Sequence, residues 1–221
     1  MIVSTSPRIE LLNCDCMEYM AGVPDKFFDL AIVDPPYGIG AGGKSFVNRN
    51  TANLKNEKFY RVNDWDKCPP DSSYWVELMR ISKHWIVFGG NYFTNFLPPS
   101  RCFIVWDKKT GNNSYADCEL ALTSINSNAR IYTKFWLGAH AVDSDGRFHP
   151  TQKPIDLYRW LLKNYAKEGD KILDTHGGSM SSAIACHQMG FDLTLCELDK
   201  DYYEAGVKRF CEQTMQQSLF K

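Results

Sequence analysis

Residues 171–197 read KILDTHGGSMSSAIACHQMGFDLTLCE, and this stretch decides the fold. A short apolar run ends in Asp174, a glycine-containing turn follows, and residues 181–189 have a helical pattern. A second apolar run, LTLC, then ends in Glu197. A strand, a turn, a helix and another strand in this order are typical of a parallel sheet with crossover helices.

The same alternation extends through the rest of the chain. Apolar runs rich in β-branched and aromatic residues, which indicate strands buried on both faces, predict strands at 27–33, 85–88, 102–106, 119–123, 131–136, 171–173 and 193–196. Helical spacing of apolar residues predicts helices at 71–82, 154–166, 181–189 and 201–211. We therefore predict an α/β fold with a mostly parallel, twisted sheet and helices on both faces.

Composition limits the class of protein. The chain has 221 residues, 44% of them hydrophobic, which is enough for one well-buried domain, and no linker or repeat divides residues 1–221. The net charge of -1 means that any nucleic-acid site must be a local basic patch. We expect no membrane span and no signal peptide, because neither apolar pattern is present. Eight scattered cysteines without a CxxC pair favour a reduced, cytoplasmic protein.

One long segment, residues 38–66, is rich in Gly, Asn, Lys and Arg and shows little periodicity. A loop of this length in a compact domain is usually functional. Residues 44–67 hold six Lys or Arg against three acids, with aromatic residues interleaved. This mixture favours phosphate contacts and a wedging aromatic, so we predict that it binds DNA, most simply a duplex. A merely solvated loop is the alternative.

The predicted strand at 27–33 ends in Asp34-Pro35-Pro36-Tyr37. The two prolines hold the chain extended and cannot donate hydrogen bonds. The Asp34 carboxylate and the Pro35 carbonyl can therefore both accept from an NH2 group, and Tyr37 can stack on the ring that carries it. An ordinary strand-terminating turn is the alternative.

Two further motifs have a ligand-binding pattern. In the turn after Asp174, glycines permit close approach of a ligand, and Glu197 can accept hydrogen bonds from ribose hydroxyls. In HPTQKP, residues 149–154, Lys153 with a neighbouring hydroxyl and amide can hold a carboxylate. Each motif alone is also compatible with a plain turn, a helix cap or a helix start.

Together these motifs resemble the beta class of amino DNA methyltransferases, over about residues 9–210. DPPY follows a strand, HPTQKP precedes a helix, and the target-amine motif comes before the cofactor motif, as in that family. The resemblance implies a Rossmann-like methyltransferase fold, S-adenosylmethionine as the cofactor, and transfer of its methyl group to an exocyclic amine of a base flipped out of DNA.

The resemblance also implies roles for single residues. Asp34, Pro35 and Pro36 would hold the target amine, and Tyr37 would stack on the base. The residues implied on the cofactor side are Asp15 and Cys16 at the adenine, Glu197 at the ribose, Asp174, His176, Gly178 and Ser179 along the methionine and ribose, and Thr151, Gln152 and Lys153 at the methionine carboxylate.

The turn departs from the family pattern D-P-F-x-G-S-G, because Met180 stands where the last glycine is expected. If that position needs a positive φ, methionine costs about 1 kcal/mol or more and weakens cofactor binding.

Direct displacement needs no metal, so we read no metal site into the histidines. Aspartate before Pro-Pro-Tyr favours N6 of adenine over N4 of cytosine. A nucleic-acid-binding relic without activity is a third hypothesis. The target sequence, a partner endonuclease as in restriction-modification, and the choice between monomer and homodimer stay open.

Overall fold

The computed structural model describes residues 7–40, 66–111, 116–136 and 151–218. Its strands form a single sheet in the order β1-β8-β7-β2-β3-β5-β4-β6. The strands are β1 (Ile9–Asn13), β2 (Phe28–Val33), β3 (Ser82–Phe88), β4 (Phe103–Asp107), β5 (Cys118–Thr123), β6 (Arg130–Thr133), β7 (Lys171–Asp174) and β8 (Asp192–Glu197). That residues 1–221 form one domain stays a prediction.

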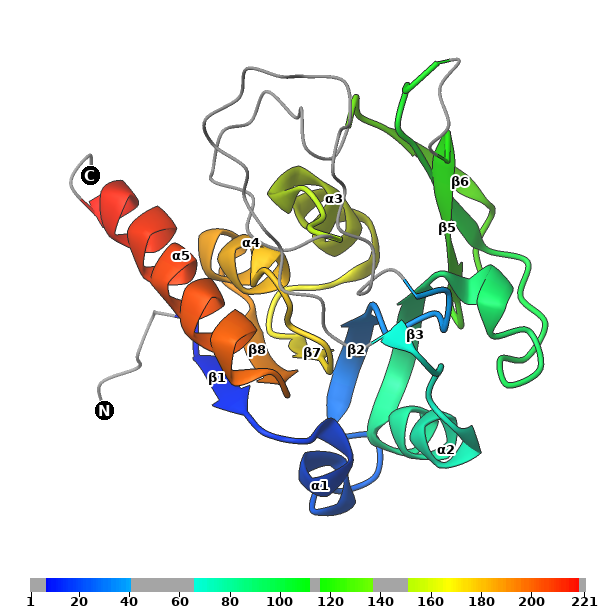
Figure 1. The fold of residues 1–221 in the computed structure, drawn as a ribbon, viewed down its shortest axis with the longest axis horizontal. Coiled ribbons are helices and arrows are strands. Elements are labelled where there is room, and N and C mark those ends of the chain that lie inside the picture. Colours follow the sequence, from blue (N-terminus) through cyan, green and yellow to red (C-terminus); the bar gives the residue numbers. More distant parts are fainter. Residues whose placement is uncertain (1–6, 41–65, 112–115, 137–150, 219–221) are drawn as a thin grey trace.

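Helices connect the parallel strands and cover both faces of the sheet. They are α1 (Cys16–Ala21), α2 (Ser72–Ile81), α3 (Ile155–Tyr165), α4 (Ser181–Met189) and α5 (Lys200–Ser218), with a short 3-10 turn, η3 (Gly90–Tyr92), after β3. Figure 1 shows α1 and α2 on one side of the sheet and α3, α4 and α5 on the other. In the described part of the chain, no helix combines the length and the apolar character that a membrane crossing requires.

The side chains of β2 show why both faces are covered. Leu30 and Ile32 pack into the core cluster that includes α3 and α4, whereas Ala31 and Val33 pack into the cluster that includes α2. Successive side chains of a strand point to opposite faces, so an uninterrupted apolar run requires apolar neighbours on both. The predicted α/β fold with a mostly parallel sheet is confirmed.

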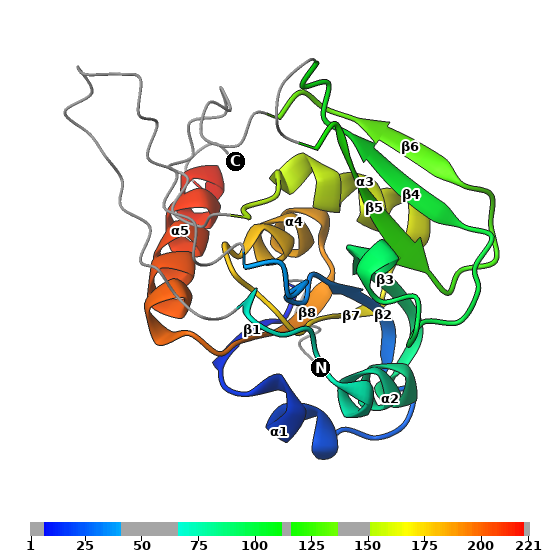
Figure 2. The ribbon, with the colours of Figure 1, turned by 45° about the vertical axis from the view of Figure 1, so that its right-hand side comes forward.

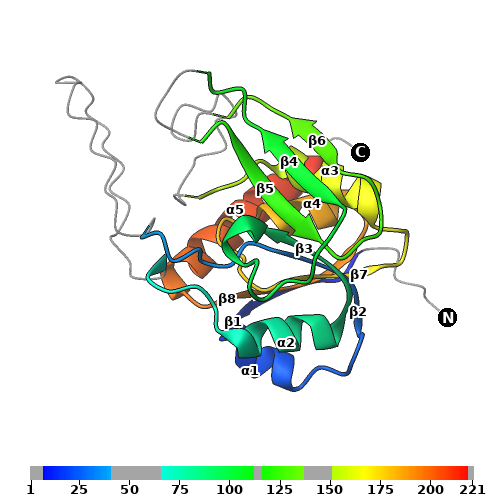
Figure 3. The same cartoon turned by 90° about the vertical axis from the view of Figure 1, so that its right-hand side faces the viewer.

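The direction of the strands determines where a site can form. β1, β8, β7, β2 and β3 are all parallel, and β4 and β6 are parallel to each other. Among the described strands, β5 is the exception, because it runs antiparallel to both β3 and β4. The C-terminal ends of these parallel strands lie along one side of the sheet, and we call that side the carboxyl edge. Figures 2 and 3 show β4, β5 and β6 twisted away from the parallel strands.

Two elements near the N-terminus were absent from the sequence prediction. β1 is an edge strand, and residues 16–21, for which no helix was predicted, form helix α1. Asp15 is its N-cap, because the carboxylate accepts a hydrogen bond from the Met17 amide at 2.7 Å. Pro154, predicted in the first turn of α3, is instead the residue before it. Most of the predicted DNA-binding loop, residues 41–65, lies outside the described residues, and so do His149 and Pro150.

Candidate active site

Three acidic residues end neighbouring strands at the carboxyl edge. Glu197 ends β8, Asp174 ends β7 and Asp34 follows β2, and these strands are adjacent in the sheet. Ligands of open α/β sheets gather at this edge. The DPPY motif and the glycine turn, far apart in sequence, therefore share one side of the molecule.

Asp34 is held by two side chains. The Tyr37 hydroxyl donates to Asp34 Oδ1 at 2.6 Å, and the Lys153 ammonium contacts Oδ2. Burial, followed by the nearby Asp34 charge, raises the pKa of Tyr37 well above its usual value, so the phenol stays protonated and can donate. Pro35 is buried beside them.

The ring of Tyr37 is fixed from several directions. It stacks on Tyr92, with centroids 4.9 Å apart and planes 15° apart. A Cβ at Gly89 would lie 2.3 Å from the ring, so this position, which also has a φ of 64°, requires glycine. The sequence reasoning missed Tyr92, whose only signal was its position just after a predicted strand.

A residue that the sequence reasoning also missed closes the DPPY turn. Asp66 is 2% exposed, and its Oδ1 accepts hydrogen bonds from the backbone amides of Tyr37 at 2.7 Å and Gly38 at 2.9 Å. Charged acceptors bind backbone amides more strongly than neutral ones do. Asp66 therefore joins the two ends of the 38–66 segment directly at Tyr37.

The Lys153 side chain is surrounded by acidic and aromatic side chains of the site. Its ammonium contacts Asp34, lies 3.5 Å from Glu119 Oε2 and sits 4.6 Å from the centre of the Phe88 ring. Burial lowers the pKa of Lys153, but the two carboxylates outweigh it and the net shift is upward. Lys153 is thus a buried cation beside Asp34, and its predicted role at the methionine carboxylate stays a prediction.

Its neighbours in HPTQKP differ from it. Gln152 is 6% exposed, and its Oε1 has no hydrogen-bond partner among the described residues. An unsatisfied buried polar atom points to a missing partner. Thr151 is half-buried. These two residues remain compatible with the predicted role at a ligand.

The glycine turn is organised by the acids on either side of it. Glu197 Oε2 accepts from the Gly178 amide at 2.6 Å, and Oε1 accepts from the Asp199 amide at 2.9 Å. Asp174 accepts from the Ser182 hydroxyl and from the His176 amide. Burial, reinforced by the nearby carboxylates, raises the pKa of Asp174 to about 7.

The remaining predicted residues have different environments. The His176 ring bonds to the Thr175 hydroxyl, and burial lowers its pKa to about 4, so the ring is neutral at pH 7. The Ser179 side chain is buried and bonds to Ser181. Cys16 begins α1 beside the Glu197 end of the sheet, and burial raises its thiol pKa to about 12.

Met180 has a backbone conformation that favours glycine. It caps α4 with φ 59° and ψ 23°, in the left-handed region, and its side chain is fully buried. The position thus does need a positive φ, as the sequence argument had posed. Gly206 in α5 leaves room for it, because a Cβ there would lie 2.5 Å from Met180 Cγ.

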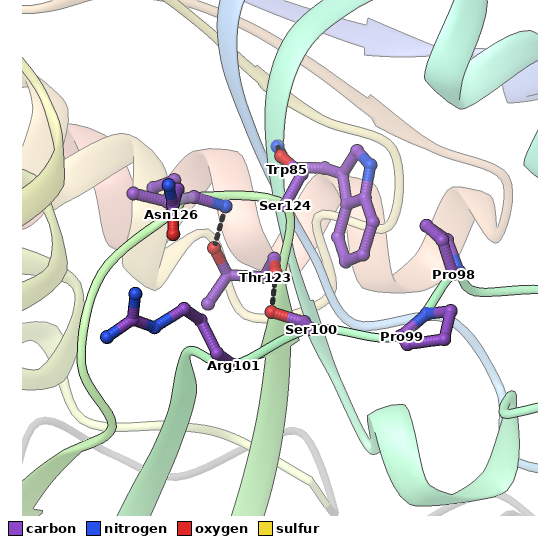
Figure 4. A pocket seen from close by; sticks show the side chains of 9 residues that line it. Trp85, Pro98, Pro99, Ser100, Arg101, Thr123, Ser124 and Asn126 are labelled. Carbon is purple, nitrogen blue, oxygen red and sulfur yellow. Dashed lines mark hydrogen bonds between the residues drawn. The ribbon is translucent and has the colours of Figure 1, made fainter.

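Two other features lie apart from this arrangement. A cavity of about 220 Å³ lies on the side of the sheet away from the carboxyl edge, beside Trp85 of β3 and the end of β5. Its lining has one charged side chain, Arg101, and no carboxylate (Figure 4). Its lining residues are Trp85, Pro98, Pro99, Ser100, Arg101, Thr123, Ser124, Ile125 and Asn126. Within the described ranges, no three His, Cys, Asp or Glu side chains gather as a metal site would need.

Comparisons with known proteins match this geometry. The type II methyltransferase M2.LlaDCHI of Lactococcus lactis subsp. cremoris is 21% identical, and the alignment covers 94% of this chain and 93% of the relative. M2.DpnII of Streptococcus pneumoniae is 20% identical, with 91% and 89% covered. Among solved structures, the M1.HpyAVI–SAM complex has a TM-score of 0.55 at 18% identity, covering 91% of this chain and 99% of the other. PvuII DNA methyltransferase, described as cytosine-N4-specific, has a TM-score of 0.59 at 12% identity, with 95% and 90% covered.

A family model described as DNA methylase matches residues 89–208, which is more than half of the chain. The matched region contains Glu119, Lys153, the glycine turn and Glu197. DPPY lies outside it and follows β2, which is the neighbour of β7 in the sheet. The protein belongs to the N6-adenine and N4-cytosine family of DNA methylases.

Proposed function

We propose that the protein transfers a methyl group from S-adenosylmethionine to N6 of adenine in DNA. One observation carries the proposal: the Asp34 carboxylate and the Glu197 carboxylate lie on the same sheet edge, with only β7 between their strands. An acceptor for an amine and an acceptor for ribose hydroxyls are thereby close enough to serve two ligands that react with each other.

The donor groups at the β7 and β8 ends fit such a cofactor. Each Glu197 oxygen accepts one backbone amide and keeps a further lone pair for a hydroxyl donor. The unpartnered Gln152 Oε1 is a hydrogen-bond acceptor that the amine at the methionine end of the cofactor can satisfy. We assign Thr151 and Gln152 to the methionine end and, because of its contact with Asp34, we assign Lys153 to the target base. The roles of Asp15, Cys16, His176, Gly178 and Ser179 at the cofactor stay proposals.

The chain's own residues perform the chemistry mainly by positioning. Asp34 and the Pro35 carbonyl accept hydrogen bonds from the amine and turn its lone pair toward the methyl donor. As positive charge grows on the nitrogen, the Asp34 carboxylate stabilises it, and the methylated nitrogen then releases its extra proton by way of Asp34 to solvent, which leaves a neutral N-methyl amine. S-adenosylmethionine, when bound, supplies a methyl group on a sulfonium sulfur, and the neutral thioether that remains is a good leaving group.

Tyr37 provides the surface on which the base stacks. Extruding the base from a duplex costs a few kcal/mol, and stacking on an aromatic ring recovers part of that free energy. Tyr92 covers Tyr37 in this structure, so the base must displace Tyr92 or enter beside it. The basic residues of the 44–67 loop, which lie almost entirely outside the described residues, are proposed as the phosphate contacts.

Sequencing with modification detection tests the base identity. DNA from a host that expresses the chain should carry N6-methyladenine at one sequence context, and DNA from a host that expresses Asp34→Ala should not. We expect the loss to exceed about 100-fold in the purified variant, because an acceptor of the transition-state charge is removed. If DNA from the wild-type host carries N4-methylcytosine instead, the target is N4 of cytosine, which is the second candidate, and not N6 of adenine.

The relic hypothesis is tested by calorimetry. Met180 in the left-handed region is the one feature that favours it. Micromolar binding of S-adenosylmethionine would reject the relic. No heat of binding at millimolar ligand would instead reject the methyltransferase, whatever base it was assigned.

A further inference from the structure

Glu119 is a carboxylate at the carboxyl edge that no strand-end motif contains. It lies near the start of β5, which runs against β3, so that the beginning of β5 meets the end of β3. The Gly89 amide donates to the Leu120 carbonyl at 2.8 Å and fixes this junction. Glu119 therefore lies at the same carboxyl edge as Asp34, although it begins its strand and Asp34 follows the end of its own.

Glu119 shares the lysine that contacts Asp34. Its Oε1 lies 2.5 Å from the Lys108 ammonium, and its Oε2 lies 3.5 Å from the Lys153 ammonium. That Oε2 atom is buried and has no hydrogen-bond partner among the described residues. Along the line Lys108, Glu119, Lys153, Asp34 the charges alternate in sign.

Both members of the central pair are charged. Burial raises the pKa of Glu119, but Lys153 and Lys108 outweigh it and the net shift is downward, so Glu119 is a carboxylate. Lys153 is an ammonium for the corresponding reason. Lys153 contacts Asp34 directly and Glu119 at the longer distance of 3.5 Å, and at both distances the two carboxylates attract the buried cation.

This sharing matters for Asp34. The target nitrogen becomes positive during methyl transfer and needs an acceptor whose charge is not already cancelled. The Lys153 ammonium contacts Asp34 directly and lies 3.5 Å from Glu119, so without Glu119 its charge would be compensated by Asp34 alone and the pocket would gain one unit of positive charge. This change opposes the growing charge on nitrogen and leaves the cofactor side untouched.

We propose that Glu119 is a positioning residue for methyl transfer, which compensates part of the Lys153 charge so that this charge does not act on the Asp34 side of the site alone. The inference rests on the proposed function. It assigns no contact between Glu119 and the base or the cofactor, because Glu119 acts through Lys153.

The test compares Glu119→Gln with Glu77→Gln. Glu77 is a matched control: its side chain is 24% exposed against 26% for Glu119, and it is also ion-paired, to Arg80 at 2.7 Å, but it lies on α2 away from DPPY. We expect kcat of Glu119→Gln to fall by about 10-fold to 100-fold. The KM for DNA and the calorimetric affinity for S-adenosylmethionine should each change by less than about threefold, since the lost interaction matters in the transition state. Glu77→Gln should keep wild-type kinetics.

Several outcomes overturn the inference. Wild-type kcat in folded Glu119→Gln would remove the role of Glu119 and leave the proposed function standing. A loss confined to cofactor affinity would do the same. If the wild-type chain methylates no DNA, the proposed function itself fails. Glu119→Asp provides a second arm should Glu119→Gln not fold: it keeps the charge, so its kcat should stay above that of Glu119→Ala, and equal rates would also refute the inference.

Discussion

Replacing Met180 by glycine separates two opposed effects at the glycine turn. The left-handed backbone at Met180 costs about 1–2 kcal/mol for a residue with a side chain, which glycine would relieve. The side chain, however, is 0% exposed. Truncating a buried methionine costs about 2–5 kcal/mol, and glycine stabilises the unfolded chain by about 0.5–1 kcal/mol more.

The lost burial outweighs the relieved strain. We therefore expect Met180→Gly to lower the free energy of unfolding by about 0.5–5 kcal/mol, although it restores the family residue. Urea unfolding followed by circular dichroism would measure this as a lower midpoint with an unchanged slope. A variant that is more stable than wild type by about 1 kcal/mol would show that strain dominates and that the side chain contributes little.

Gly206 provides the second half of the argument. Gly206→Ala alone should destabilise the protein by about 1–3 kcal/mol, because the new Cβ would lie 2.5 Å from Met180 Cγ. In the Met180→Gly background that contact is gone, although the Gly178 carbonyl remains 3.2 Å away. The two substitutions should therefore couple by about 1 kcal/mol or more. Strict additivity would refute the claim that Gly206 exists to accommodate Met180.

Three further predictions concern the two motifs. Asp66→Ala should lower the free energy of unfolding by about 1–3 kcal/mol, because the amides of Tyr37 and Gly38 lose their acceptor; Asp66→Asn, which keeps an acceptor oxygen, should lose less in the same urea titration. Gly89→Ala should reduce kcat by about 10-fold or more with unchanged helix content, because its Cβ would displace the Tyr37 ring. Asp174 has a folded-state pKa of about 7, above its unfolded value, so its contribution to stability is present at low pH and lost as pH rises through 7. Asp174→Asn should flatten that decline in urea midpoints measured between pH 5 and pH 8.

The sequence was sufficient for the strands and helices that are buried. β2, β3, β7 and β8 each contain a buried, largely apolar run, and residues flanked by core on both sides have little freedom to form anything else. β1 was missed because it is an edge strand in which a glutamate interrupts the apolar residues. α1 was missed because six residues are too few to establish a helical period.

The site was predicted in part, for a related reason. DPPY, the glycine turn and Glu197 follow strands, and the rule that ligands gather where parallel strands end identified them from local patterns. Lys153 was assigned to the cofactor because its local pattern suits a carboxylate. The structure shows in addition that Lys153 contacts Asp34, which is 119 positions away, and no spacing encodes that contact.

Glu119 shows what a search of strand ends omits. The strand at 119–123 was predicted correctly, yet its acid comes at the beginning, where a parallel strand would place it on the far side of the sheet. β5 runs antiparallel, so its beginning lies at the carboxyl edge, beside Gly89 and facing Lys153. Strand direction depends on connectivity, because a strand that pairs directly with its successor reverses and one joined by a crossover helix does not. In mixed sheets of this kind, acids that begin the reversed strand belong among the candidate site residues, and Glu119→Gln tests that rule in this chain.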